Sequence, residues 1–249
     1  YINGKKVDDH LLSPAVSDFS KRNLYVTHDV TGDLKPGDNS IALWLGRGWY
    51  VRGHPGVIHD GPLVRAQVEV TLADGSSVKV GTDATWKVRE SPLTPLGKGT
   101  AFGDYGGERY DSRLELPGWN SIALDDSSWQ SAELFDPPQV TTAAQMVEPN
   151  RIMETVKPVK VWEFSPGVYM MQMERNYTGW FEFRIPSGLA PGSVVRLEYA
   201  DFPPSGTRFA NNNQRDEIVV KGNEPQTFCS RFNYHAFGWV RITGLPKPP

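Results

Sequence analysis

The sequence predicts an all-β protein made of two antiparallel β-sandwich modules of the jelly-roll type. Apolar and polar residues alternate with a period of two in many short segments. Glycine (24) and proline (20) are spread between those segments as turn residues. Residues 1–130 carry no sustained apolar period of 3.6 residues, so we expect little helix there.

The first half of the chain contains the clearest alternation. Residues 63–72 place Val64, Val68 and Val70 on one face and polar residues on the other. The turn Ala73-Asp74-Gly75 then predicts a hairpin with a return strand at 77–80. We expect further strands at 24–30, 40–45 and 86–88.

A second group of strands is expected after residue 160, at 168–173, 180–185, 193–199, 217–220, 227–232 and 239–243. The stretch before it has no clear period and contains Pro137-Pro138 and Pro149-Asn150. We therefore predict a first module at 1–135, a connector at 136–160 and a second module at 161–249.

Charge and cysteine content restrict the classes of partner. A net charge of -3 does not favour nucleic acid or an anionic membrane, and no apolar run is long enough to span a bilayer. Cys229 is the single cysteine, so the chain has no internal disulfide; its apolar strand pattern predicts an inert thiol. The compartment, cytoplasmic or periplasmic/secreted, stays open. The five histidines show no metal-ligand spacing, so no zinc site is expected.

Several motifs together resemble a known family. In the first half they are Tyr1–Val7, Asp29–Thr31, Leu34–Asn39, Leu45–Tyr50, Tyr105–Glu115 and Asp125–Trp129, in the order and spacing of the N-terminal module of bacterial α-L-rhamnosidases. In the second half, Arg175–Trp180, Leu197–Asp201, Asp216–Gly222 and Arg231–Trp239 resemble the concanavalin-like module that follows it in glycoside hydrolase family 78. The second module departs from the family pattern at Glu174-Arg175-Asn176 and at Ala236–Trp239.

This resemblance implies a non-catalytic role for the chain. In the family, hydrolysis of terminal α-L-rhamnosides with inversion takes place in a downstream (α/α)6 barrel, which supplies two glutamates. Inversion needs two carboxyl groups roughly 6.5 to 9.5 Å apart, with a water between them. We therefore assign no catalytic residue, interpret the chain as an excerpt, and expect that downstream barrel and a rhamnose-containing glycan as partners.

Residues Gly106–Arg113 are the first candidate sugar-binding segment, interpreted as a loop. Asp111 and Arg113 could form hydrogen bonds with a sugar diol, and the ring of Tyr105 or Tyr110 could cover its C–H groups. The alternative is that Asp111 and Arg113 pair with each other or with the backbone, and so fix the entry of a strand. The segment also supplies Glu108. No cofactor is required, but some relatives bind rhamnose with calcium, for which the oxygen donors to test are Asp104, Glu108 and Asp111.

The segment Arg47–His54 is the second candidate, because Trp49 and Tyr50 lie between arginines and could stack on a sugar. The alternative is that Trp49 is a core residue. Two other functions stay open. One is a sugar-binding or structural region of another glycoside hydrolase, such as a family 2-type enzyme. The other is a self-contained glycosidase that uses Asp104 and Glu108.

Overall fold

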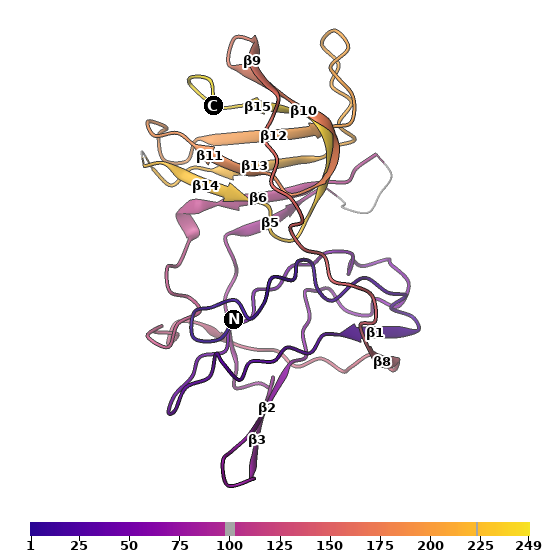
Figure 1. The fold of residues 1–249 in the computed structure, drawn as a ribbon, viewed down its shortest axis with the longest axis vertical. Coiled ribbons are helices and arrows are strands. Elements are labelled where there is room, and N and C mark those ends of the chain that lie inside the picture. The colour runs from indigo at the N-terminus through magenta and orange to yellow at the C-terminus, as the bar shows by residue number, and fades with distance from the viewer. Residues whose placement is uncertain (98–102, 223) are drawn as a thin grey trace. The chain divides into compact units, whose positions relative to one another are not determined.

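The computed structural model describes residues 1–97, 103–222 and 224–249, and Figure 1 shows its ribbon. The chain forms two compact units. The first contains Tyr1–Asp8, Pro14–Glu90 and Pro117–Glu148, and the second contains Asp9–Ser13, Ser91–Leu116 and Pro149–Pro249. Within the described residues the helical structure is a single 3-10 turn, η1 (Ser112–Leu114), so the predicted all-β class is confirmed. None of the described helical structure is long and apolar enough to cross a membrane.

The first unit is held by three short strand pairs. The predicted hairpin is formed by β2 (Gln67–Thr71) and β3 (Ser77–Gly81), in antiparallel register. Its turn is closed by Asp74, whose carboxylate accepts hydrogen bonds from the backbone N–H and the hydroxyl of Ser76. The other pairs are parallel β1 (Arg22–Tyr25) with β8 (Thr141–Ala144), and antiparallel β4 (Lys87–Val88) with β7 (Gln130–Ser131).

One expected strand of the first unit, 40–45, is reduced to an isolated bridge between Ile2 and Ile41. Aromatic packing holds this region instead. The Trp119 ring lies edge-on to Tyr1 at 5.1 Å and to Trp44 at 5.7 Å between ring centroids. These apolar contacts are formed without a long hydrogen-bonded ladder.

The second unit is organised by a seven-stranded sheet in the order β5-β6-β13-β12-β15-β10-β9. The β6–β13 pair is parallel and the other neighbours are antiparallel. The bounds are β5 (Leu93–Leu96), β6 (Gly107–Asp111), β9 (Lys160–Ser165), β10 (Val168–Gly179), β12 (Val194–Ala200), β13 (Arg215–Val219) and β15 (His235–Thr243). A two-stranded sheet, β11 (Glu182–Ile185) with β14 (Gln226–Cys229), completes the unit (Figure 1).

The larger core of the second unit lies on the inner face of the large sheet, and a smaller buried cluster of Met170, Ala200 and Phe209 lies on the other face. On β12, Val195, Leu197 and Tyr199 are fully buried. The Phe181 ring, next to β11, lies edge-on to Tyr199 at 5.9 Å. Phe228 of β14 packs against Tyr110 of β6, so the small sheet covers the inner face of the large one and makes a sandwich.

The units differ from the expected domain boundaries of 1–135, 136–160 and 161–249. Strands β5 and β6 come from the first half of the sequence but belong to the sheet of the second unit. The expected connector is divided between the units, because β8 belongs to the first and residues from 149 onward to the second. In the second unit, Leu11 N–H donates to the carbonyl of Asn150, and Arg151 pairs with Asp9 at 2.8 Å.

Candidate functional site

The segment Gly106–Arg113, expected to be a loop, is largely strand β6, inside the seven-stranded sheet. Residues 107–111 are hydrogen-bonded to β5 on one side and to β13 on the other. Strand alternation therefore directs Glu108 and Tyr110 toward the sandwich interior, and Arg109 and Asp111 toward the outer face of the sheet. The candidate residues of this segment are separated onto two faces.

Glu108 is an interior residue, with 2% of its surface exposed. Its carboxylate accepts hydrogen bonds from the backbone N–H groups of Arg231, at 2.9 Å, and Phe232. Burial, followed by the charge of nearby Asp216, raises the pKa of Glu108 to about 7, although those backbone hydrogen bonds act in the opposite direction. The side chain ties β6 to the turn after β14.

Asp216 of β13 is the centre of this buried polar cluster and is fully enclosed. It accepts hydrogen bonds from the Tyr199 hydroxyl at 2.7 Å and the Glu108 backbone N–H at 2.8 Å. The Nε2 atom of His235 lies 3.2 Å from both carboxylate oxygens, and the His235 ring stacks on Tyr199 at 4.0 Å. Sequence reasoning did not identify this cluster, because its members come from four distant segments.

Tyr110 and the Asp111–Arg113 pair complete the segment. The buried Tyr110 hydroxyl donates to Glu115 at 2.8 Å, and burial raises the pKa of this phenol. Arg113 donates through Nε and Nη2 to the two carboxylate oxygens of Asp111, at 2.9 and 2.7 Å. These side-chain hydrogen bonds hold the pKa of Asp111 below its usual value. The pairing considered as an alternative for Asp111 and Arg113 is therefore the one observed.

The three donors proposed for calcium do not converge. Glu108 and Asp111 are three residues apart on one strand, so their side chains project to opposite faces. Asp104 lies before the strand and accepts a hydrogen bond from the Asn213 side chain. Tyr105 is 38% exposed and lies before β6, whereas Asp111 is the last residue of this strand. The strand is roughly 13 Å long at about 3.3 Å per residue, so Tyr105 and Asp111 lie at opposite ends of it.

Trp49 and Tyr50 belong to the first unit. The Tyr50 ring packs edge-on against Phe19 at 5.4 Å, within the unit. Trp49 is 45% exposed, in a turn in which Tyr50 N–H donates to the carbonyl of Arg47. Of these two aromatic residues, Trp49 is the more exposed.

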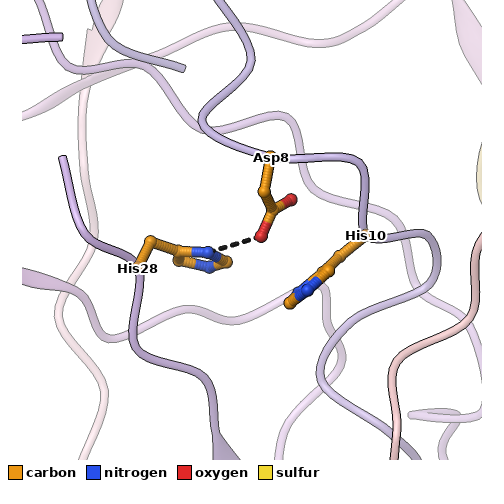
Figure 2. Close-up of side chains that lie close together, drawn as sticks. All are labelled: Asp8, His10 and His28. Carbon is orange, nitrogen blue, oxygen red and sulfur yellow. Dashed lines mark ion pairs between the residues drawn. The ribbon is translucent and has the colours of Figure 1, made fainter. Parts of the chain in front are cut away.

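The first unit also contains an ion pair between His28 and Asp8, whose Nδ1 and Oδ2 atoms lie 2.6 Å apart (Figure 2). His10, also drawn, belongs to the segment of the second unit. We assign no metal site to these residues. Cys229 is partly buried, and burial raises the pKa of its thiol, which disfavours the reactive thiolate.

Two pockets lie in the first unit. One, of about 510 Å³, is lined by Leu24, Ala143 and Met146, with Asp18 as its carboxylate. The other, of about 260 Å³, is lined by Trp119 and Asn120, with Asp126. Each of these two pockets is lined by one carboxyl group.

The described residues thus form an all-β protein of two compact units. Residues 1–154 match the model of the alpha-L-rhamnosidase N-terminal domain, and residues 162–249 match that of the bacterial alpha-L-rhamnosidase concanavalin-like domain. The chain therefore belongs to the bacterial α-L-rhamnosidase family and comprises these two domains.

Relatives and solved structures agree with this assignment. The chain is 33% identical to an alpha-L-rhamnosidase of Streptomyces avermitilis and 28% identical to one of Formosa agariphila; both matches cover 100% of this chain, but 24% and 27% of the relatives. The structure resembles the Streptomyces avermitilis α-L-rhamnosidase complexed with L-rhamnose (TM-score 0.87, 32% identity), covering 100% of this chain and 24% of that one. It also resembles the enzyme from Dictyoglumus thermophilum (TM-score 0.85, 32% identity), covering 100% and 28%. The chain thus spans about a quarter of the length of these relatives.

Proposed function

We propose that this chain is the accessory, non-catalytic part of an α-L-rhamnosidase, and that it braces a downstream catalytic barrel. The observation that carries the proposal is coverage: two rhamnosidase domains account for nearly the whole chain, which is about a quarter of each relative. The parent enzyme would hydrolyse terminal α-L-rhamnosides. The same match favours this function over the family 2-type alternative.

Exposed apolar side chains of the second unit support the bracing role. Ile152 and Met153 are 65% and 89% exposed, and Val159 and Phe164 nearby are also exposed. Large apolar side chains exposed to this degree are typical of a surface that another domain covers. In this proposal, the covering domain is the catalytic barrel of the same polypeptide.

Bracing is tested in the whole rhamnosidase polypeptide with the double variant Ile152→Ser/Met153→Ser. We expect the melting temperature of the catalytic domain to fall by several degrees, while the 249-residue chain alone keeps its stability. Val80→Ser, in the exposed β2–β3 hairpin, is the matched control, because Val80 is 46% exposed. Equal melting temperatures for the double variant and the control would contradict the bracing role.

We further propose weak binding of L-rhamnose by the two accessible candidates, the Asp111–Arg113 pair and Trp49. A carboxylate accepts hydrogen bonds from neighbouring hydroxyls, a guanidinium donates to their oxygens, and an indole face covers the deoxy methyl group. Calorimetry with L-rhamnose, with and without calcium, tests this on the 249-residue chain, with Asp111→Asn and Trp49→Ala as variants. Absence of heat at millimolar L-rhamnose would contradict the binding proposal, and bracing would be the only proposed role that remains.

We expect the 249-residue chain alone not to hydrolyse an aryl α-L-rhamnoside, because we place both catalytic carboxyl groups in the downstream barrel. Purified chain and a mock purification from cells lacking it are assayed together. Turnover well above the mock purification would overturn the non-catalytic role.

A further inference from the structure

The outer face of the seven-stranded sheet carries two cross-strand rows of charge. In the first row, Glu217 of β13 lies opposite Arg109 of β6 and opposite Arg196 of β12. In the second row, Glu198 of β12 lies opposite Arg215 of β13 and Arg241 of β15. Each row therefore reads arginine, glutamate, arginine across three adjacent strands. We call these six residues the arginine ladder.

The glutamates of the ladder are covered and hold the arginines in place. Glu217 accepts from Arg109 Nη1 at 2.8 Å and from Arg196 Nη2 at 2.8 Å, and Arg241 donates to both oxygens of Glu198 at 2.7 Å. The Glu217 and Glu198 side chains are only 8% and 13% exposed. The carboxylates are therefore covered by the arginine side chains, and a ligand would contact them little.

The guanidinium groups form the accessible surface. Arg109 and Arg196 side chains are 42% and 49% exposed. Each guanidinium has five N–H donors, and the hydrogen bonds to Glu217 use one from Arg109 and two from Arg196. Four arginines against two glutamates give the ladder an excess of two positive charges, in a chain whose net charge is -3.

Aromatic residues lie on the same face. Trp239 is two residues before Arg241 on β15, and its ring is edge-on to Trp162 of β9 at 6.0 Å. Both rings are partly buried, because they pack against a buried cluster that includes Met170, and they expose only part of their surface. Indole rings suit the C–H face of a sugar, and preorganised arginines suit a planar carboxylate, which they bind through two parallel hydrogen bonds. This combination fits an acidic oligosaccharide better than an acidic peptide.

We propose that the arginine ladder is a binding surface for an anionic oligosaccharide, whose uronate carboxylates contact Arg109 and Arg196. The choice of a glycan rests on the proposed function above. The surface itself is distinct from the Asp111–Arg113 and Trp49 candidates. Binding is electrostatic and weakens with salt, because the guanidinium groups are exposed.

The test is calorimetry of the 249-residue chain with tetragalacturonate, and with its fully methyl-esterified form as a neutral probe. We expect the acidic form to bind and the ester not to, and raising salt from about 50 to about 200 mM to weaken binding severalfold. Arg196→Gln and Arg109→Gln should each lower the affinity by about fivefold or more, because each removes one charged contact. Arg196→Lys should retain part of it.

Arg175→Gln is the matched control, since Arg175 is 67% exposed and outside the ladder. Thermal melting confirms that every variant is folded. The inference is overturned if tetragalacturonate gives no heat, if Arg196→Gln binds like the control, or if the ester binds equally. Equal binding of poly-glutamate would also overturn it, in favour of an acidic protein surface. L-rhamnose is titrated in parallel as a test of the proposed function, so that a failure of the arginine ladder to bind can be distinguished from a failure of the proposed function.

Discussion

The backbone N–H of Glu108 donates to Oδ1 of Asp216 at 2.8 Å, so two carboxylate-bearing residues from the two halves of the sequence share one buried region. This contact joins β6 to β13 in the only parallel pairing found within the described part of the large sheet. The groups that face Glu108 are Asp216, Tyr199, Cys229 and the backbone N–H groups of the turn at 231–233. His235 adjoins Asp216.

The stability of the second unit should depend on pH through Glu108. Its pKa in the folded protein is about 7, above its ordinary value of 4.5, so folding favours the protonated acid. This contribution is fully present below about pH 4.5 and is lost as the pH rises through about 7, with an upper bound of about 3 kcal/mol. Hydrogen exchange of β12 and β13 amides between these pH values measures it.

Glu108→Gln is the control for that dependence, since an amide does not titrate in this range. The variant should be less stable at every pH, because its amide NH2 meets backbone N–H donors. Its stability should nevertheless change less between pH 4.5 and 7 than that of the unaltered chain. Parallel pH profiles would show that Glu108 is not the titrating group.

Tyr199→Phe should destabilise the second unit by about 1–3 kcal/mol, because it leaves Asp216 without its shortest side-chain donor. The phenyl ring can retain the stacking on His235 and the contacts with Phe181 and Phe237. Tyr234→Phe, at a residue 44% exposed, should have no measurable effect. Urea unfolding compares the two; equal midpoints would contradict the role assigned to the hydroxyl.

Gly107→Ala should disrupt the β6–β13 pairing. A Cβ at this position would lie 1.6 Å from the backbone carbonyl oxygen of Arg215. Because this neighbour is a backbone atom, no side-chain movement can relieve the clash. We expect faster hydrogen exchange in β6 and β13. Gly179→Ala is the matched control, because nothing lies within 4 Å of its added Cβ and it should exchange as before. Protected β6 amides in Gly107→Ala would refute this.

Leu197→Ala should cost about 2–5 kcal/mol, the range for removing a fully buried leucine side chain. Leu197 lies on the inner face of β12, between the cross-strand partners Asp216 and Ile242. Val194→Ala, on the same strand but 37% exposed, should lower the free energy of unfolding by about 1 kcal/mol at most. The midpoints of denaturant unfolding compare the two variants. Similar losses of stability would contradict the assignment of Leu197 to the core.

By itself the sequence determined the all-β class and the individual strands with regular alternation. Residues 67–71 and 194–200 show why, because burial along each strand alternates with its own sequence pattern. The strand 77–81 is exposed, and the turn at Asp74-Gly75 beside it in the sequence predicted it. In each case the information is local. The rhamnosidase motifs likewise survive as short contiguous stretches, which the matches to the two domains confirm.

Tertiary structure alone decided the neighbours of each strand, and with them the candidate sites. Gly106–Arg113 resembles a loop in isolation, because Gly106-Gly107 and charged residues give no apolar period. It becomes a strand because β13, about a hundred residues later, supplies its hydrogen-bond partners and encloses Glu108. The arginine ladder has the same origin: its charges alternate across strands rather than along the chain, and strand order is a property of long-range pairing.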